Sequence, residues 1–314
     1  MTGTVWVKLC LKPKKPPFDF NLKMGFSAGG GKPTPAVFEG GVWRRAFRVE
    51  GRLVPVAASP AGTVDAPILT VSVPREFRRV LREVARRVSL LLGADGDPRP
   101  LYDFMGRDPV LRVLKERLYG LGCAGRMSTT VYEGVVKAII QQQVSIRVAE
   151  KVTGNLVEAF GDRVLYGGEA YYEFPTPQTL AEASLEGLRA CGVSWRKAEY
   201  IREFSRAVSE GRFNPEELYG KDPEEIVRIL SGFRGVGRWT AELVMVASMG
   251  MNVTPADDLG VRKAVSEFYF NGELQDADTV RGVAEKWGRH ARDVVVHLLY
   301  ANRLGLKPKR NMAS

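Results

Sequence analysis

The chain has 314 residues, 45% of them hydrophobic, so it can bury two or three cores without disulfides or metals. Its formal net charge of +10 suits a polyanionic partner, although a basic balance alone is a weak sign. Cys10, Cys123 and Cys191 lie far apart, which argues against a disulfide scaffold, a zinc site and an iron–sulfur cluster. No apolar run approaches membrane length and the start lacks a signal-peptide pattern, so a cytoplasmic location is expected.

The first hundred residues alternate hydrophobic and polar side chains in short runs. This alternation predicts strands, separated by turns rich in glycine and proline, over residues 5–9, 43–49, 53–57 and 68–73. Residues 74–92 instead repeat their hydrophobic side chains at helical spacing. We therefore expect an α+β domain over residues 1–100, in which one helix backs an antiparallel sheet, and a linker over residues 93–98.

From residue 101 onward the pattern is almost entirely helical. Hydrophobic residues recur at helical spacing over residues 129–142, 145–160, 179–190, 195–209, 223–230, 238–248, 259–270, 277–286 and 291–304. One insertion, over residues 166–177, interrupts this series, and the sequence assigns no role to it. This part of the chain is predicted to be all-α.

The most informative segment, residues 230–241, reads Leu-Ser-Gly-Phe-Arg-Gly-Val-Gly-Arg-Trp-Thr-Ala. Asp222 and Pro223 are typical of a helix start, so one helix is expected to end in this glycine turn and a second to begin directly after it. Gly235 and Gly237 can adopt a positive φ and let another backbone approach. The free N–H groups of the second helix then point outward, and such an arrangement binds phosphate.

The segment 254–260, Thr-Pro-Ala-Asp-Asp-Leu-Gly, places two adjacent carboxylates before another predicted helix. By pattern alone, both are most simply explained as helix caps. The adjacent pair also allows Asp257 to cap the helix while Asp258 faces a site, where the helix start favours its charged form. A phosphate anchor followed by such an acid indicates chemistry on a nucleic acid.

These two segments, and the segment Ala-Ile-Ile-Gln-Gln-Gln-Val-Ser over residues 138–145, resemble those of the helix-hairpin-helix DNA glycosylases, and within that superfamily the AlkA-type alkylbase glycosylases. Further matches, at residues 16–26, 174–177 and 197–198, extend the resemblance over nearly the whole chain. It implies an amino-terminal α+β domain followed by an all-α glycosylase core of two helical subdomains. One comprises residues 132–250 and carries the hairpin. The other comprises residues 101–131 plus 251–314 and carries the acid.

The resemblance also implies roles for individual residues. Asp258 is the catalytic carboxylate, which stabilises positive charge on the deoxyribose, and Asp257 is the helix cap. The hairpin residues implied to bind DNA phosphate are Gly235, Gly237, Arg238 and Thr240. The residues whose backbone carbonyls are implied to hold a monovalent cation, Na⁺ or K⁺, are Ser231, Phe233 and Val236. No catalytic cofactor is implied.

Trp239, Phe26 and His290 match the family's base pocket, where an electron-rich ring suits a cationic purine. Taken alone, each is as readily explained as a core or surface residue. Bifunctional members of the superfamily carry a lysine in place of Trp239, so this chain is expected to be monofunctional. Gln143 matches the side chain that fills the gap left by a flipped nucleotide, whereas Gln142 is expected to brace nearby loops.

The expected function is a monofunctional DNA glycosylase of base excision repair, which flips alkylated purines of the 3-methyladenine type out of the duplex and releases them by hydrolysis. The expected partner is damaged double-stranded DNA, with no membrane role, and the protein is expected to be a monomer associated with the nucleoid. Two alternatives stay open: an oxidised-base glycosylase/lyase of the 8-oxoguanine type, and a non-catalytic helix-hairpin-helix DNA-binding protein.

Overall fold

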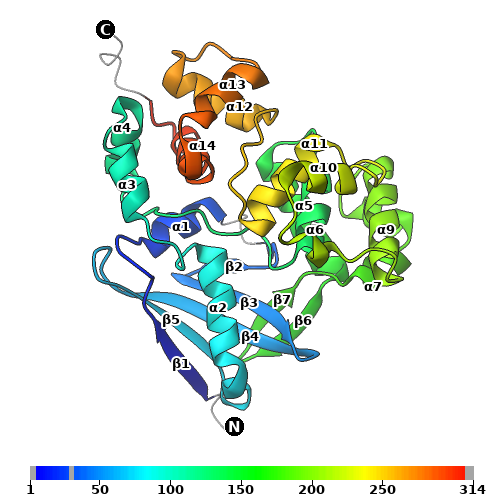
Figure 1. Cartoon of the computed structure of the whole chain (residues 1–314). Coiled ribbons are helices and arrows are strands. Elements are labelled where there is room, and N and C mark those ends of the chain that lie inside the picture. Colours follow the sequence, from blue (N-terminus) through cyan, green and yellow to red (C-terminus); the bar gives the residue numbers. More distant parts are fainter. Residues whose placement is uncertain (1–4, 28–31, 308–314) are drawn as a thin grey trace.

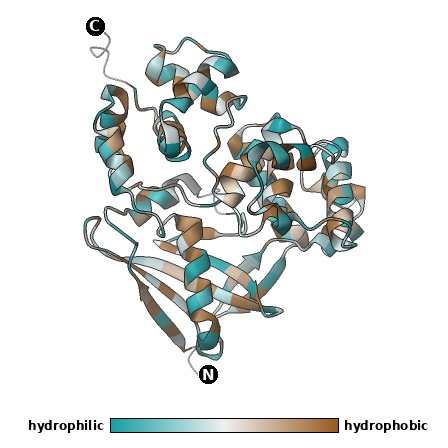
Figure 2. Cartoon of the chain, in the orientation of Figure 1, coloured by the Kyte–Doolittle hydropathy of each residue, from teal (hydrophilic) through white to brown (hydrophobic). Residues whose placement is uncertain are grey.

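The computed structural model describes residues 5–27 and 32–307. An antiparallel sheet formed by the amino-terminal part of the chain is followed by two groups of helices (Figure 1). Hydrophobic and hydrophilic residues interleave along the strands and helices, as amphipathic elements around shared cores require (Figure 2). The predicted fold class, an α+β domain followed by a helical core, is confirmed.

The sheet is entirely antiparallel, with the strand order β1-β5-β4-β3-β2. Its strands are β1 (Trp6–Leu11), β2 (Val37–Glu39), β3 (Val42–Val49), β4 (Arg52–Gly62) and β5 (Pro67–Pro74). The helix η1 (Arg75–Val80) continues directly into α2 (Leu81–Leu92), which covers one face of the sheet and buries Val84 and Val88 against it. The sequence pattern predicted four of the five strands and this helix. It did not predict the short β2 or the helix α1 (Phe20–Ser27).

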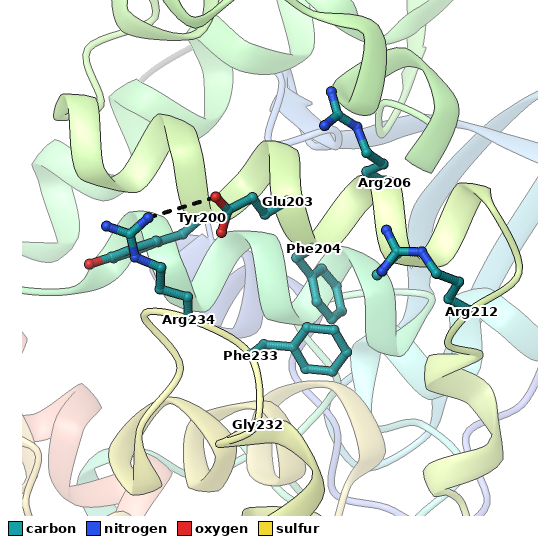
Figure 3. Close-up of a pocket in the computed structure, with 9 residues that line it drawn as sticks. Tyr200, Glu203, Phe204, Arg206, Arg212, Gly232, Phe233 and Arg234 are labelled. Atoms are coloured by element: carbon teal, nitrogen blue, oxygen red, sulfur yellow. Dashed lines mark ion pairs between the residues drawn. The ribbon is translucent and has the colours of Figure 1, made fainter.

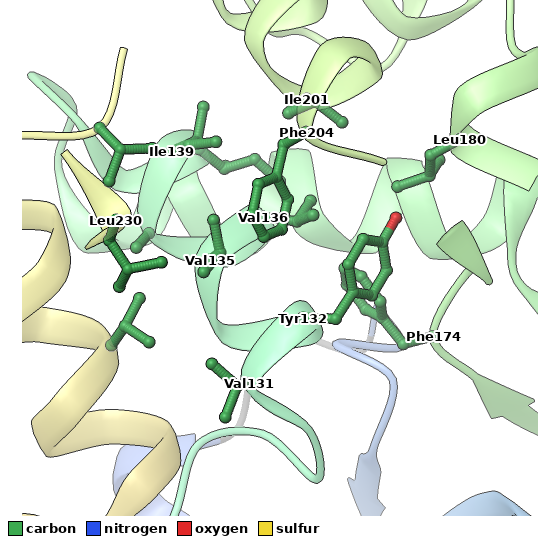
Figure 4. Close-up of a cluster of buried hydrophobic side chains, with 14 of the residues drawn as sticks. Val131, Tyr132, Val135, Val136, Ile139, Phe174, Leu180, Ile201, Phe204 and Leu230 are labelled. Carbon is green, nitrogen blue, oxygen red and sulfur yellow. The ribbon is translucent and has the colours of Figure 1, made fainter. Parts of the chain in front are cut away.

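The helical part surrounds two separate cores. The first core draws its buried side chains from residues 131–249, and Figure 4 shows part of it around Tyr132, Val136 and Phe204. The second draws on residues 101–121 and 256–301. These stretches parallel the predicted subdomains, whose bounds stay a prediction. The helices are α3 (Arg99–Met105), α4 (Pro109–Arg117), α5 (Val131–Gln141), α6 (Ile146–Phe160), α7 (Pro177–Glu182), α8 (Leu185–Ala190), α9 (Trp195–Ser209), α10 (Pro223–Leu230), α11 (Arg238–Val244), α12 (Leu259–Tyr269), α13 (Ala277–Glu285) and α14 (Ala291–Arg303).

The insertion between α6 and α7 has a clear structural role. It forms a two-stranded hairpin of β6 (Asp162–Tyr166) and β7 (Glu169–Glu173), and β7 lies beside β3 (Figure 1). The backbone N–H of Arg48 donates to Glu173 at 3.0 Å, and the Arg48 side chain pairs with Asp162. The hairpin therefore fastens the first helical core to the amino-terminal sheet.

A network of buried charges lies at the same contact. The guanidinium of Arg45, 2% exposed, reaches Glu133 at 3.1 Å and Glu173 at 2.5 Å. Lys137 binds the second oxygen of Glu133 at 2.6 Å. Burial raises the pKa of Glu133, but the charges of Arg45 and Lys137 outweigh it and bring this pKa down to about 2. The buried charge network, Arg45, Glu133, Lys137 and Glu173, thus joins β3, α5 and β7.

Replacing Arg45 by methionine should destabilise the protein strongly. Two buried carboxylates would lose their shared cation, and breaking a buried ion pair from one side costs roughly 3–5 kcal/mol. Arg48→Met is the matched control, because it removes a half-exposed pair on the same strand that is worth about 0–1 kcal/mol. The free energy of unfolding in urea measures both effects, and equal losses in the two variants would contradict the importance assigned to the network.

Candidate active site

The glycine turn, residues 231–237, joins α10 to α11. Its residue Phe233 packs against other aromatic rings. The ring of Phe233 lies 5.0 Å from that of Phe204 and 4.8 Å from that of Phe213. Gly235 has a φ of +82°, and a Cβ built there would lie 2.0 Å from the ring of Tyr200. Only glycine satisfies both conditions, so Gly235 shapes the turn as the sequence predicted.

Gly237 differs from this prediction. Its φ is −103°, an ordinary extended value, and it is the residue that caps the start of α11. A Cβ built there would meet nothing within 4 Å. The expected positive φ at Gly237 is therefore wrong, and the residue leaves open space beside the start of α11.

Two predicted phosphate-binding side chains are engaged within the protein. Arg238 forms a bidentate pair with Glu224 at 2.8 and 2.6 Å. Thr240 is 2% exposed, and its hydroxyl accepts a hydrogen bond from the Gln142 side-chain amide at 3.0 Å. The burial of Thr240 argues against a phosphate contact through its hydroxyl and favours a role inside the turn. The contact at Arg238 stays a prediction, because its half-exposed guanidinium would first have to leave Glu224.

Gln142 and Gln143, at the end of α5, differ in their surroundings. Gln143 is exposed and has a φ of +55°, which is rare for a residue with a side chain. Gln142 instead donates from its amide to the Gly235 carbonyl at 2.7 Å, which confirms its expected bracing role. The ammonium of Lys197 closes the helix end by donating to the carbonyls of Ile140 at 2.9 Å and Gln142 at 2.5 Å. The loop that presents Gln143 is thus anchored to the glycine turn.

Asp258 lies directly beside the predicted pocket aromatic. The indole N–H of Trp239, which is half-buried, donates to Asp258 Oδ2 at 3.0 Å. The other oxygen, Oδ1, accepts from the backbone N–H of Val261 at 2.9 Å and caps α12. The expectation that Asp257 would cap this helix is therefore wrong. Asp257 is exposed and lies 3.7 Å from Arg281, so the cap and the candidate acid are the same residue.

His290 and Phe26 are the other two residues predicted to line the base pocket. His290 is half-buried and stacks on Phe104, with ring centroids 5.2 Å apart. Burial lowers the pKa of His290, and the neighbouring charge of Arg289 lowers it further, so a neutral ring is favoured. Phe26 belongs to α1, but its side chain lies outside the described residues. The sequence did not predict a site role for Phe104, because the contact between Phe104 and His290 depends on how α3 packs against the carboxyl-terminal helices.

A second residue that the sequence did not predict is Glu242, a buried carboxylate near the glycine turn. It lies in α11, 5% exposed, with Oε1 3.6 Å from Arg238. Its Oε2 has no hydrogen-bond partner among the described residues, and burial raises its pKa. In the sequence it occupies a core-facing position of a helix, and nothing local distinguishes it from a residue paired within the core.

A pocket of about 390 Å³ lies on the α9 side of the glycine turn (Figure 3). Its lining includes Phe204, Phe233, Arg206 and Arg234, and it contains neither Trp239 nor Asp258. Arg234 is turned toward α9, where its guanidinium lies over the ring of Tyr200 at 5.6 Å. This pocket is therefore distinct from the candidate base pocket.

The carbonyl groups predicted to hold a cation fit a monovalent ion. They are neutral ligands, and the Phe233 carbonyl accepts the Val236 N–H at 3.0 Å while keeping a second lone pair. Within the described residues, no group of three His, Cys, Asp or Glu side chains is placed to hold a metal ion. The same residues contain no helix long and apolar enough to cross a bilayer.

Comparison with known proteins places this geometry in a family. Residues 136–290 match the HhH-GPD superfamily of base excision DNA repair proteins, and residues 12–92 match an AfAlkA-like, TATA-box binding protein-like domain. A 3-methyladenine DNA glycosylase from Archaeoglobus fulgidus has a similar structure, with a TM-score of 0.86 and 44% identity, covering 96% of this chain and 99% of that one. The chain belongs to the HhH-GPD superfamily.

Within the HhH-GPD superfamily, the chain is AlkA-like. DNA-3-methyladenine glycosylase 2 of Escherichia coli (strain K12) is 26% identical over 91% of this chain and 95% of its own length. A putative DNA-3-methyladenine glycosylase of Bacillus subtilis (strain 168) is 31% identical over 50% of this chain, which spans about half, 54%, of that protein.

The two glycines of the turn should respond differently to alanine. Gly235→Ala places a methyl group against the Tyr200 ring at a positive φ, and we expect it to lower the free energy of unfolding by at least about 2 kcal/mol. Gly237→Ala should change it by less than about 0.5 kcal/mol, yet weaken DNA binding, because its methyl group fills the space in front of α11. Thermal unfolding and DNA titration separate the effects. Unchanged DNA affinity in Gly237→Ala would contradict the phosphate site.

Proposed function

We propose that the protein is a monofunctional DNA glycosylase of base excision repair, which hydrolyses the N-glycosidic bond of alkylated purines of the 3-methyladenine type. The observation that supports this most directly is the hydrogen bond of 3.0 Å between Trp239 and Asp258. It joins a candidate acid to a ring suited to a cationic base, beside a turn built to accept phosphate. The relatives named 3-methyladenine glycosylases give the substrate class.

The proposed reaction breaks the bond between C1′ of the deoxyribose and the base nitrogen. The base takes the bonding electrons, so an alkylated purine, already cationic, leaves as a neutral molecule without protonation. Positive charge then develops on the sugar, and the Asp258 carboxylate stabilises it electrostatically. Water adds to C1′ and gives up its proton, for which Asp258 is the candidate acceptor. The products are the free base and an abasic site.

The base pocket is proposed to form around the exposed part of Trp239. An electron-rich indole face attracts a cationic purine by stacking and by the cation–π interaction, worth about 0.5–2 kcal/mol. Its N–H is already bound to Asp258, so the ring and the acid hold a fixed relative position. The stacked pair of His290 and Phe104 and the side chain of Phe26 are further candidates for the pocket wall.

The DNA backbone is proposed to bind at the glycine turn, where the space beside Gly237 faces the first N–H groups of α11. Gln143 enters the duplex and occupies the gap left by the flipped nucleotide, where its amide can bind the orphaned base. Flipping costs a few kcal/mol, which such a side chain partly recovers. A monovalent cation at Ser231, Phe233 and Val236 would support the turn.

The proposal includes a monomeric protein in the cytoplasm, associated with the nucleoid and without a membrane role. Its one macromolecular partner is duplex DNA. No cofactor takes part in the proposed reaction, because the leaving base carries its own positive charge.

Replacing Asp258 by asparagine tests the role of the acid. Asparagine also caps helices, so α12 should remain intact, while the negative charge beside the sugar is lost. We expect base release from methylated duplex DNA to fall by about 10²-fold or more, with DNA affinity retained. Asp257→Asn is the matched control and should keep full activity. If the wild-type protein bound DNA but released no base, the non-catalytic alternative would be favoured.

A glycosylase/lyase mechanism is the other alternative, and it uses a lysine at the hairpin position that Trp239 occupies here. Trp239 stands where the nucleophilic lysine would be, and the Lys197 ammonium is bound to two carbonyls. We therefore expect no strand nicking at abasic sites and no covalent adduct with DNA in the presence of borohydride. A trapped adduct on a denaturing gel would overturn the monofunctional assignment.

A further inference from the structure

The positive charge of the chain is concentrated in its amino-terminal domain. Residues 1–100 hold 17 Lys and Arg and 8 Asp and Glu, whereas residues 101–314 hold 29 and 28. The amino-terminal domain therefore carries a net charge of +9 and the helical core only +1. The part of the protein expected to grip the lesion is nearly neutral, so the excess charge needs another explanation.

Much of this charge lies along one helix. In the continuous helix formed by η1 and α2, Arg75, Arg79, Arg82 and Arg86 recur at spacings of four, three and four residues. All four are exposed, and the hydrophobic residues of α2 face the sheet instead. Arg75 and Arg79 belong to the 3-10 helix η1 and Arg82 and Arg86 to α2, so the four side chains do not share one strict face. They form an uneven row along the helix axis, the arginine stripe, which is roughly 19 Å long.

The acids nearby do not neutralise the arginine stripe. Arg86 shares Glu83 with Arg87, at 3.0 and 2.8 Å. Glu76 accepts a hydrogen bond from the Tyr166 hydroxyl. For Arg75, Arg79 and Arg82, no ion pair is found within residues 5–27 and 32–307. Two more exposed arginines, Arg78 and Arg52, flank the row, and Arg52 lies over the Phe77 ring at 4.7 Å.

Such a row is costly unless something binds to it. Like charges at adjacent helical positions destabilise a helix by a few tenths of a kcal/mol per pair. A polyanion removes this repulsion, and duplex DNA has the right geometry. Each strand places one phosphate about every 3.4 Å of duplex axis, so a row of roughly 19 Å parallel to the axis spans about five of them. Arginine's fork of donors also suits phosphate oxygens.

The arginine stripe lies apart from the candidate active site. The carboxyl-terminal end of α2 meets the helical core, where the N–H of Arg126 donates to the Leu90 carbonyl at 3.1 Å. From there α2 runs across the sheet, and its amino-terminal end, which η1 precedes, lies away from α10 and α11 (Figure 1). The stripe and the glycine turn are therefore carried by different parts of the fold.

We propose that the arginine stripe is a second DNA-binding surface, which contacts the phosphate backbone of undamaged duplex DNA without reading sequence. It keeps the protein close to DNA while the glycine turn and Asp258 are free to engage a lesion. This proposal concerns binding to undamaged DNA and does not depend on the proposed catalytic activity.

The test replaces Arg75, Arg79, Arg82 and Arg86 by glutamine, which keeps the helix propensity and removes the charge. Binding of an undamaged duplex of about thirty base pairs is measured by anisotropy between about 50 and 200 mM salt. Each lost phosphate contact lowers the slope of log affinity against log salt by about 0.9, so the slope should become shallower by about 3 to 4. Base release from a saturating lesion duplex, in a single turnover, should stay at the wild-type rate.

A matched control removes the same charge elsewhere, by glutamine substitution of the exposed residues Arg99, Arg112, Arg163 and Arg212. Its salt slope should stay close to the wild-type value. The proposal is overturned if the stripe variant keeps the wild-type salt slope, or if the slope of the control variant falls as much. Binding to anionic lipid vesicles is measured in parallel. A stripe variant that loses vesicle binding but keeps DNA binding would also overturn the proposal. Absence of base release in the wild type, with the expected slopes, would reject the proposed catalytic function and leave the second surface standing.

Discussion

The buried ion contact of Arg45 with Glu133 and Glu173 is the constraint on which the arrangement of the molecule depends. Its three side chains come from the amino-terminal sheet, from α5 and from the β6–β7 hairpin, and each is buried. A buried charge is tolerated only where its partners are correctly placed, so the contact leaves little freedom for the sheet to slide on the helical core. Hydrophobic packing alone is less directional.

The helix α5 connects the buried charge network to the loop that presents Gln143. The helix begins at the buried charge network, where Lys137 and Glu133 are held, and ends at the loop that presents Gln143. There, Gln142 fastens the loop to the Gly235 carbonyl and Lys197 closes the helix end. The loop that carries the side chain proposed to enter the duplex is therefore joined by a hydrogen bond to the turn proposed to bind its phosphate.

The sequence predicted those features that arise from local chemistry. Alternation predicted β3, β4 and β5, helical spacing predicted the helices, and the need for glycine at Gly235 followed from the turn itself. The β6–β7 hairpin was missed because its stabilising partners, such as Arg48, lie more than a hundred residues away in the sequence. A pattern read along the chain carries no information about such a contact.

At the candidate site, the chemical types were predictable and their pairings were not. Two adjacent aspartates cannot reveal which one caps α12, because the answer depends on where Trp239 lies across the boundary between the helical cores. Likewise, Thr240 offers a hydroxyl that suits phosphate, and only the position of Gln142 shows that it is used internally. Gly237 was wrongly expected at a positive φ because glycine permits that conformation without requiring it.

The two hydrogen bonds of Asp258 explain how one carboxylate can serve both structure and chemistry. Oδ1 is committed to the N–H of Val261, so the side chain cannot rotate without uncapping α12. Oδ2 accepts the indole N–H of Trp239 and keeps a second lone pair, because a carboxylate oxygen accepts two hydrogen bonds. The cap fixes where the negative charge lies, and the indole fixes the ring beside it. In the proposed mechanism, a base stacked on that ring would therefore meet an acid whose position relative to the ring is already set by a hydrogen bond.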